Sequence, residues 1–151
     1  MKERIIAIAA DHGGYQLKEI IKTHLDEICV KYVDFGTDSE ESCNYSEFAR
    51  RACNSIQDGA CDMGILVCGT GIGMSLAANK CKGIRAACCS DTFSIRMTRL
   101  HNDANVMCIG ARVVGQGLAI DMVDLFLNTE FEGGRHVERI GMIAEIEKEG
   151  R

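Results

Sequence analysis

The sequence contains no proline. Average usage of about 5% would give about seven prolines in a chain of this length. Their absence excludes polyproline recognition segments and turns built on cis-proline. The turns must therefore depend on glycine, which occurs 16 times and adopts backbone conformations that other residues avoid.

Cysteine is abundant, but the patterns that would give it a structural role are missing. None of the nine cysteines stands in a CxxC pair, which argues against a zinc cage. The apolar run at residues 5–10 is too short for a secretory signal and ends in polar residues without a cleavage site. We therefore expect no disulfide framework, but a cytoplasmic protein in which most cysteines are reduced, buried and packed as small hydrophobic residues.

An excess of positive charge is also lacking. The net charge is −5 and the pI is about 5.4, so the chain has no general attraction to DNA or RNA. Any anionic ligand must be held by a local cluster of positive groups. With 151 residues, 46% of them hydrophobic and 26% charged, the chain has the size and composition of one globular domain, expected over residues 1–151, and not of a membrane, collagen or disordered protein.

Short apolar runs alternate with segments of helical spacing along the chain. Strands are predicted at residues 4–10, 30–35, 63–68, 84–89 and 105–110, and helices at residues 15–28, 46–57, 74–80, 92–101, 115–127 and 134–148. The alternation predicts an α/β fold of three layers, in which a five-stranded, mostly parallel sheet has helices on both faces. Ligands of such sheets bind beyond the carboxyl ends of the strands, so the loops there are the first candidates for function.

A glycine-rich loop, Cys68-Gly69-Thr70-Gly71-Ile72-Gly73, follows the third predicted strand and leads into a helix. Its backbone N–H groups could face an anion. It departs from a dinucleotide fingerprint, because Met74 stands where the third glycine of GxGxxG belongs and the loop does not follow the first strand. A P-loop would need Lys and Ser or Thr after the glycines. Nucleotide binding is therefore the weaker interpretation, beside an anion-binding turn or a turn required only for packing.

Cys68 differs from the other cysteines by its place at a strand end, directly before the glycine loop. A helix N-terminus favours the thiolate form of a nearby cysteine, which acts as a base or nucleophile, although Cys68 could equally be one more core thiol. Asp11 and His12 follow the first strand. If the strand order begins 2-1-3, they lie beside the Cys68 loop; the alternative is a helix N-cap for Asp11 and a surface position for His12.

Two further polar segments lie toward the C-terminus. His101 and Asn102 close the fourth predicted helix, where a histidine often only complements the helix dipole. Arg135 and Arg139 lie one turn apart at the start of the last helix. Such a pair suits a phosphate, although salt bridges to nearby glutamates explain it as well. Arg112, just after the fifth strand, is a further candidate of the same kind.

Five blocks of sequence carry a family resemblance: DHGGYQLK, DFGT, CGTGIGMSLAANK, RLHNDANVMCIGAR and FEGGRHVERI. In this order, and over essentially the whole chain, they resemble the type B ribose-5-phosphate isomerases, whose wider family includes galactose-6-phosphate isomerase subunits and allose-6-phosphate isomerase. The resemblance implies a Rossmann-like fold and an aldose–ketose isomerase that uses no metal and no other cofactor. It also implies a homodimer or a dimer of dimers with shared active sites, in which the C-terminal helix, about residues 134–149, packs at the dimer interface.

The resemblance also assigns catalytic roles to matching positions. Cys68 would be the base that moves a proton between C1 and C2 of the sugar, with Thr70 assisting it. The backbone amides of the loop would stabilise the enediolate together with Asn102; the loop residues concerned are Gly69, Gly71, Ile72 and Gly73. One branch of the family has a glutamate base at the position of Met74, so this chain resembles the cysteine branch.

Ring opening and substrate binding are assigned in the same way. His101, with Asp11, would open the furanose ring by proton transfer. The residues that would hold the phosphate and the sugar hydroxyls are His12, Arg112, Arg135 and Arg139, with His136 close by and Tyr45 lining the pocket.

The predicted reaction is the interconversion of ribose 5-phosphate and ribulose 5-phosphate, a step of the pentose phosphate pathway. The expected partners are a small sugar phosphate and further copies of the chain, with no nucleic acid and no membrane. The alternatives are isomerisation of allose 6-phosphate or galactose 6-phosphate within the same family. A non-catalytic module that binds a phosphosugar or a nucleotide is a third possibility, but it would not need both a base and a ring-opening histidine.

Overall fold

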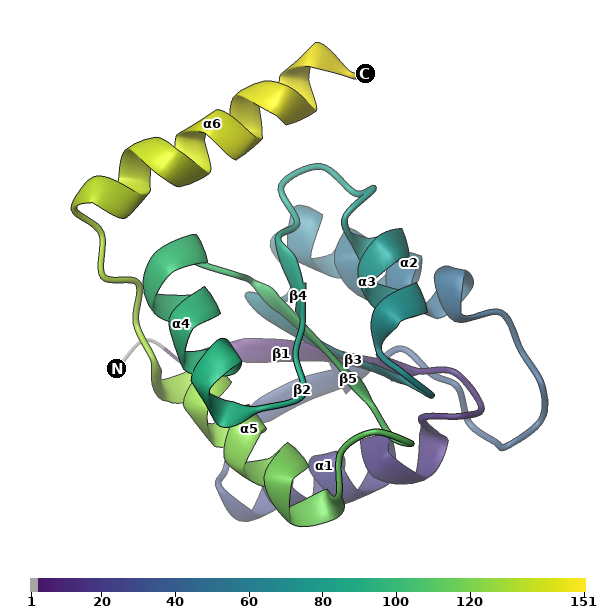
Figure 1. The fold of residues 1–151 in the computed structure, drawn as a ribbon. Coiled ribbons are helices and arrows are strands. Elements are labelled where there is room, and N and C mark those ends of the chain that lie inside the picture. The colour runs from purple at the N-terminus through teal and green to yellow at the C-terminus, as the bar shows by residue number, and fades with distance from the viewer. Residues whose placement is uncertain (1–2) are drawn as a thin grey trace.

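A five-stranded parallel sheet forms the middle of the protein (Figure 1). The computed structural model describes residues 3–151. The strands are β1 (Ile5–Ala10), β2 (Lys31–Asp34), β3 (Met63–Cys68), β4 (Ala86–Cys88) and β5 (Val106–Gly110). Their order is β2-β1-β3-β5-β4, and every neighbouring pair is parallel. The parallel sheet is confirmed, and its order begins 2-1-3, which places the loops after β1 and β3 side by side.

Helices cover both faces of the sheet, as predicted. They are α1 (Tyr15–Glu27), α2 (Tyr45–Gln57), α3 (Ile72–Ala78), α4 (Thr92–Asn102), α5 (Gln116–Asn128) and α6 (Arg135–Glu149). Ile6 and Ile8 of β1 pack in one core cluster with side chains of α1 and α5. Ala7 and Ala9 pack in a second cluster with side chains of α2 and α3. The strand therefore serves two cores, which explains why its sequence is apolar throughout.

Most predicted boundaries agree with the structure within one residue, and two elements differ from it by two residues. The strand predicted at residues 84–89 covers only Ala86–Cys88, because β4 is an edge strand that pairs with β5 alone and is partly exposed. The helix predicted to begin at residue 74 begins at Ile72, because Gly71 already turns the chain with a φ of 80°. Neither difference moves the glycine loop away from the carboxyl edge of the sheet.

The last helix, α6, extends away from the body of the molecule (Figure 1). His136 is its one buried residue. Four of its apolar side chains keep between 48% and 65% of their surface exposed: Val137, Met142, Ile143 and Ile146. Met142, Ile143 and Ile146 are spaced to lie on one side of the helix, whereas Val137 lies on the other. An exposed apolar helix face of this kind marks a surface that binds another molecule. No helix within residues 3–151 has both the length and the apolar character needed to cross a bilayer.

All nine cysteines are free thiols. Cys53, Cys61, Cys68 and Cys108 are buried, and three others are half-buried, in agreement with the expected packing role. Cys29 and Cys88 are exposed and do not have that role.

Candidate active site

The glycine loop after β3 wraps around the thiol of Cys68. The backbone N–H of Gly71 donates a hydrogen bond to Cys68 Sγ over 3.1 Å. Gly71 has a φ of 80°, and a Cβ at this position would lie 2.9 Å from the backbone of Ile109, so only glycine fits. The N–H of Ile72 donates to Thr70 Oγ1 over 3.2 Å, which holds the loop in shape. The thiol is thus buried at the strand end, with an N–H group directed at its sulfur.

The loop after β1 lies against the glycine loop, as the strand order requires. A Cβ built on Gly13 would be 3.4 Å from the backbone nitrogen of Gly69 and 3.4 Å from Asp11 Oδ1. Asp11 is only 7% exposed, and its Oδ1 accepts a hydrogen bond from the N–H of Gly14 over 3.1 Å. Because the residue before α1 is Gly14 and no side chain caps this helix, the N-cap interpretation of Asp11 is wrong. Its carboxylate instead belongs to the same edge as Cys68.

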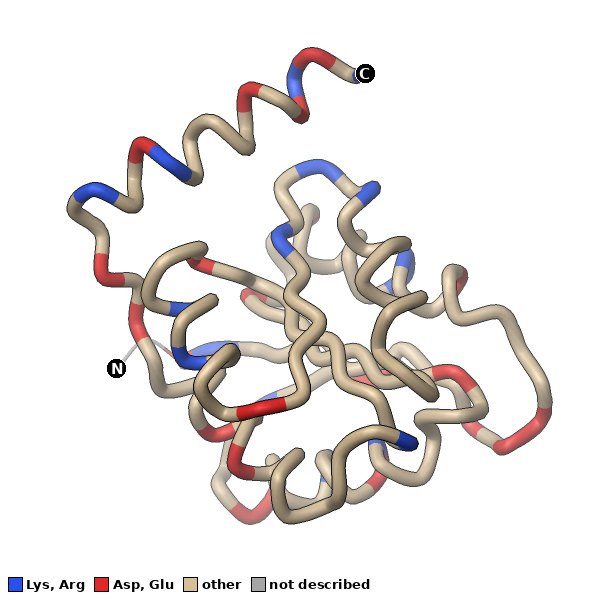
Figure 2. Tube along the Cα trace, in the orientation of Figure 1, with Lys and Arg blue, Asp and Glu red and all other residues tan. Residues whose placement is uncertain are grey.

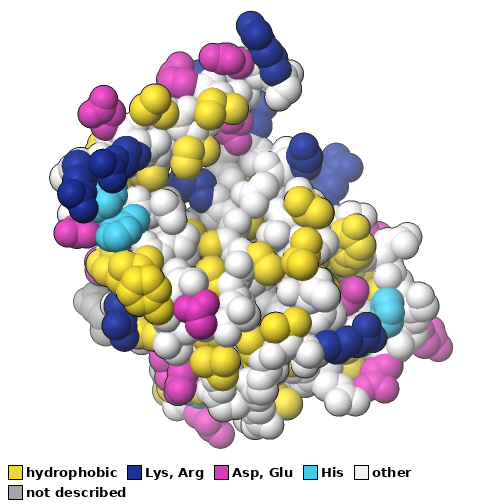
Figure 3. All heavy atoms as spheres, in the orientation of Figure 1, with side chains coloured by type: hydrophobic (Ala, Val, Ile, Leu, Met, Phe, Trp, Pro, Cys, Tyr) yellow, Lys and Arg dark blue, Asp and Glu magenta, His cyan; other side chains and the backbone are white. Residues whose placement is uncertain are grey.

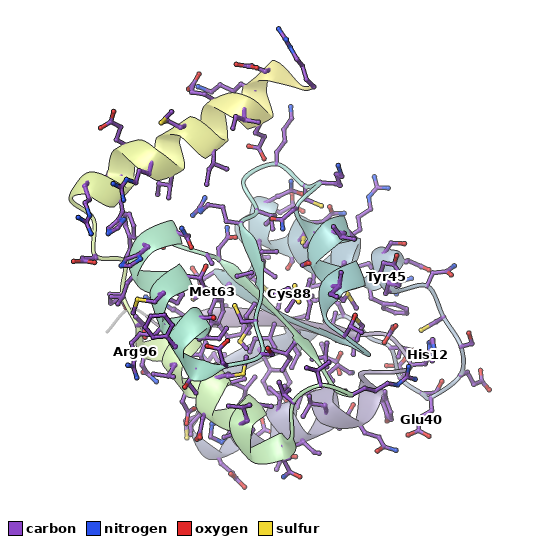
Figure 4. The ribbon with its side chains drawn as sticks, in the orientation of Figure 1. His12, Glu40, Tyr45, Met63, Cys88 and Arg96 are labelled. Atoms are coloured by element: carbon purple, nitrogen blue, oxygen red, sulfur yellow. The ribbon has the colours of Figure 1, made fainter. Side chains whose placement is uncertain are left out.

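His12 and Tyr45 complete this edge (Figure 4). The N–H of Cys43 donates to His12 Nδ1 over 3.2 Å. In the neutral imidazole the proton is therefore on Nε2, which leaves a hydrogen-bond donor for a ligand. The ring of Tyr45 packs on Gly73, where a Cβ would lie 2.9 Å from ring carbons.

Arg112 brings a positive charge to the same loops. Its backbone N–H donates to the carbonyl of Gly69 over 3.0 Å, and a Cβ on Gly69 would lie 3.3 Å from the guanidinium Nη1. We call this group of side chains the carboxyl-edge cluster; it consists of Asp11, His12, Tyr45, Cys68, Thr70 and Arg112.

A buried ion pair, which the sequence interpretation missed, joins α1 to β2 next to this edge. The side chain of Lys18 is fully buried, and its Nζ donates to both oxygens of Asp34, over 2.8 and 2.6 Å. Asp34 Oδ1 in turn accepts the N–H of Gly36 over 2.9 Å, and Gly36 pairs with the backbone of Ala10, next to Asp11. The only signal in the sequence is a lysine between the inward-facing positions of the first helix, which is not specific.

Two stacked histidines form a second polar group, where α4 ends and α6 begins. The ring centroids of His101 and His136 are 4.3 Å apart, with the planes at 16°. Glu132 Oε2 lies 3.7 Å from His101 Nε2 and 3.6 Å from His136 Nε2. Burial, together with the neighbouring His101 and Arg135, lowers the pKa of His136.

Arg135 and Arg139 lie beside these histidines, at the positively charged start of α6 in Figure 2. Neither arginine forms an ion pair with a carboxylate of residues 3–151, so the salt-bridged surface considered from the sequence is absent there. We call the whole group the amino-edge cluster; it consists of His101, Asn102, Glu132, Arg135, His136 and Arg139. Glu132 was considered from the sequence only as a partner for arginine, whereas the structure places it on the histidines.

The two clusters lie at opposite edges of the sheet. Cys68 is opposite Gly110, where β5 ends, whereas His101 and Asn102 precede the start of β5 at Val106. The strand between these levels is about 13 Å long at the usual rise per residue. Figure 3 shows the corresponding histidine and Lys/Arg side chains at two separate places, one over the start of α6 and one over the loops that follow the strands. One chain therefore brings ten of the fifteen predicted site residues together at the carboxyl edge and the other five at the amino edge.

Among residues 3–151, a single set of three His, Cys, Asp or Glu side chains has its donor atoms close enough to share a metal ion. This set is His101, Glu132 and His136, with all three ligand atoms within 4.8 Å of one another.

The parallel sheet, with a thiol, a carboxylate and an N–H-lined glycine loop at its carboxyl edge, defines an α/β protein equipped for acid–base chemistry on a small anionic molecule. Comparison with known proteins makes the identification specific. The chain belongs to the Ribose/Galactose Isomerase family, whose family model matches residues 6–143.

Several relatives resemble the chain over almost its whole length. Ribose-5-phosphate isomerase B of Escherichia coli is 46% identical over 143 residues, which cover 95% of this chain and 96% of the relative. The solved structure of ribose-5-phosphate isomerase B from Clostridium thermocellum is 49% identical, with a TM-score of 0.96 and coverage of 97% and 99%. That of Mycoplasma genitalium, solved with bound ribulose-5-phosphate, is 41% identical, with a TM-score of 0.92 and coverage of 96% and 97%. The predicted family and fold are confirmed.

Proposed function

We propose that the protein interconverts ribose 5-phosphate and ribulose 5-phosphate in an active site made by two copies of the chain. The observation that carries the proposal is the thiol of Cys68, held under the glycine loop beside Asp11 and Arg112. The Mycoplasma genitalium relative with bound ribulose-5-phosphate supports this choice of substrate.

Proton transfer between the two sugar carbons is assigned to Cys68. Its thiolate removes the proton from C2 of the open-chain aldose and returns it to C1. The proton of the C2 hydroxyl passes to the oxygen on C1, so that C2 becomes the carbonyl carbon of the ketose. The enediolate formed in between carries negative charge, which the backbone amides of Gly69 to Gly73 stabilise together with Asn102. Thr70 assists the base from the same loop.

Ring opening precedes this step and needs an acid and a base. His101 and Asp11 divide these tasks: one takes the proton of the C1 hydroxyl while the other protonates the ring oxygen, so that the carbonyl group forms. The phosphate is remote from both carbons, and its binding energy serves to orient them. It is held by the positive groups of both clusters: His12, Arg112, Arg135 and Arg139, with His136 close by and Tyr45 lining the pocket.

The distance between the clusters is the reason for a shared site. His101 and Asp11 cannot act on one sugar within one chain, because they lie at opposite edges of the sheet. A homodimer, alone or within a dimer of dimers, solves this problem if the carboxyl-edge cluster of one copy faces the amino-edge cluster of the other. The exposed apolar side chains of α6 then pack against the second copy, within an assembly of single-domain chains.

The free thiols are the observation that bears on the cellular compartment of the protein. Nine unpaired cysteines, one of them a base, fit a reducing environment, and we propose the cytoplasm.

An isomerisation assay on the purified protein tests the proposal. Ribose 5-phosphate should be converted to ribulose 5-phosphate, and turnover should be compared with that on allose 6-phosphate and galactose 6-phosphate. The Cys68→Ala variant should bind substrate but lose about 10²- to 10⁴-fold in turnover, the usual contribution of a general base. Cys61→Ala is the matched control, because Cys61 is also buried but precedes β3 at the other edge.

Two results would contradict the proposal. Absence of turnover on every five- and six-carbon sugar phosphate would exclude an isomerase of this class. Equal turnover of the Cys68→Ala and Cys61→Ala variants would remove Cys68 from the role of base.

A further inference from the structure

His101, Glu132 and His136 offer the donor set of a zinc site. Two imidazoles and one carboxylate are a known ligand combination for Zn²⁺, with the fourth position left to water or substrate. The three side chains come from three segments, namely the end of α4, the connection after α5 and the first turn of α6. The fold, and not local sequence, therefore brings them together.

The distances within this set suit a tetrahedral ion. Both histidine Nε2 atoms lie near the same carboxylate oxygen, Glu132 Oε2, at 3.7 and 3.6 Å. Ligand atoms bound to one tetrahedral Zn²⁺ through bonds of about 2.1 Å are about 3.4 Å apart. The largest separation in the set is within 4.8 Å. Because a metal lies in the plane of the imidazole that binds it, the half-buried His101 would turn out of its stack on His136, and the exposed Glu132 would follow.

The surroundings bring the donors together without occupying them. His136 is 4% exposed and stacks on His101. The backbone N–H of Glu132 donates to the carbonyl of Leu100 over 3.0 Å, which ties its segment to α4. Within residues 3–151, the Glu132 carboxylate lies within 4 Å of these two histidine nitrogens and forms no ion pair with a lysine or arginine. A metal ion therefore would not have to displace a permanent cation.

The donor types, together with nearby positive charge, decide which metal is favoured. Arg135 and Arg139 lie close enough to influence His136 electrostatically. They disfavour hard cations such as Mg²⁺ and Ca²⁺, which depend on several charged oxygen ligands. Zn²⁺ prefers imidazole nitrogen and needs only the one carboxylate present.

We propose that His101, Glu132 and His136 bind one Zn²⁺ per chain and that this ion inhibits the protein. The inhibitory part rests on the proposed function, in which His101 exchanges a proton with the sugar ring. An imidazole nitrogen that is bonded to Zn²⁺ can neither accept nor donate that proton. The ion would also occupy the side of the shared site where the phosphate is to be bound.

A binding experiment tests the site without relying on activity. Zn²⁺ affinity of the reduced protein is measured by competition with a chromophoric chelator, and the ligand type is read from the absorption spectrum of the Co²⁺ form. The Glu132→Gln variant keeps the size of the side chain but loses its charge, and should bind Zn²⁺ about 10- to 100-fold more weakly or worse. Glu138→Gln, which changes another carboxylate of α6, should bind like the unmodified protein.

Equal affinities of the two variants would overturn the site. A sulfur-to-cobalt charge-transfer band that persists in the Glu132→Gln variant would also overturn it, because it would place the ion on cysteine.

The inhibition is tested separately, as the activity of each variant with Zn²⁺ relative to the same variant without it. The unmodified protein and Glu138→Gln should lose activity and regain it with a chelator, whereas Glu132→Gln should resist. Inhibition of all three to the same degree would refute this part of the proposal. If the chain isomerised no sugar phosphate, the proposed function and the inhibition would fall, while the binding experiment would still decide the metal site.

Discussion

Cys68 is distinguished from the other cysteines by its hydrogen bond and not by its burial. Four cysteines are buried, and burial raises the pKa of Cys53 to about 12 and that of Cys108 well above its ordinary value. Such thiols remain protonated at neutral pH and act only as core residues. Only Cys68 stands at the carboxyl end of a central strand, where Gly71 directs an N–H at its sulfur. Sequence position was sufficient to single it out, whereas composition was not.

Thiol labelling tests this division. In the folded protein at neutral pH, iodoacetamide should modify the exposed Cys29 and leave Cys53, Cys89 and Cys108 unmodified. Burial raises the pKa of Cys89 to about 11, so it too lacks the reactive thiolate. Mass spectrometry of the peptides gives the answer, and all nine cysteines should react after unfolding. Modification of Cys53 or Cys108 as fast as that of Cys29 would show that these thiols are not held in the core.

Protonation of Asp34 makes the free energy of unfolding depend on pH in the acid range. Burial opposes ionisation of its carboxyl, but hydrogen bonds from Lys18 and Lys22 outweigh this effect and lower its pKa. The unfolded chain therefore binds the proton more readily. The stabilisation is complete above the ordinary aspartate pKa and is lost as the pH falls through the lowered value.

The Asp34→Asn variant should lower the free energy of unfolding at pH 7 by about 3 kcal/mol, because it leaves the buried charge of Lys18 with only the partly exposed carboxylate of Glu19, 3.4 Å away. It should also remove this part of the acid dependence. Urea denaturation between pH 7 and pH 3 measures both effects, with Asp58→Asn on the surface as the control. A variant that is as stable as the unmodified protein at pH 7 would show that the ion pair contributes nothing.

At the scale of helices and strands, hydrophobic spacing was a sufficient guide. All five strands and six helices occur where the pattern predicts them, and the sheet and helices α1 to α5 bury apolar side chains against one another. Helix α6 is the exception, because it buries only His136. The largest boundary differences, of two residues, lie at the edge strand β4 and at Gly71, where the local pattern is weakest. Lys18 could not be predicted, because its partner Asp34 is on another element and pairing depends on the folded chain.

A substitution at Gly14 tests how closely the start of α1 approaches the sheet. A Cβ at this position would overlap the carbonyl group of Val67 in β3, and a backbone group cannot move aside cheaply. Gly14→Ala should destabilise the protein by about 1–3 kcal/mol or more. Gly117→Ala in α5, where a Cβ meets open space, should instead stabilise it by about 0.5–1 kcal/mol. Thermal denaturation of the two variants is the measurement, and equal melting temperatures would contradict the close contact.

For the whole molecule, the sequence predicted a set of site residues but not how far apart they lie in one chain. Family resemblance named the residues of both clusters as one site, and spacing along the chain contains nothing that separates them. The structure places Cys68 at one edge of the sheet and His101 at the other, with α6 extending from the body. The separation arises because α4 ends at the amino edge of the sheet, where β5 begins. Because of this separation, the proposed reaction requires an active site shared by two copies of the chain, which the family resemblance alone had only led us to expect.

Complementation between two inactive variants tests this requirement most directly. Cys68→Ala and His101→Asn should each be almost inactive alone, because each removes one half of every site. After joint refolding or co-expression, about half of the dimers should contain one copy of each variant, and each of these should have one intact site. The mixture should therefore recover about a quarter of the activity of the unmodified protein. A mixture no more active than the two variants separately would show that both residues act within one chain, and would contradict the account.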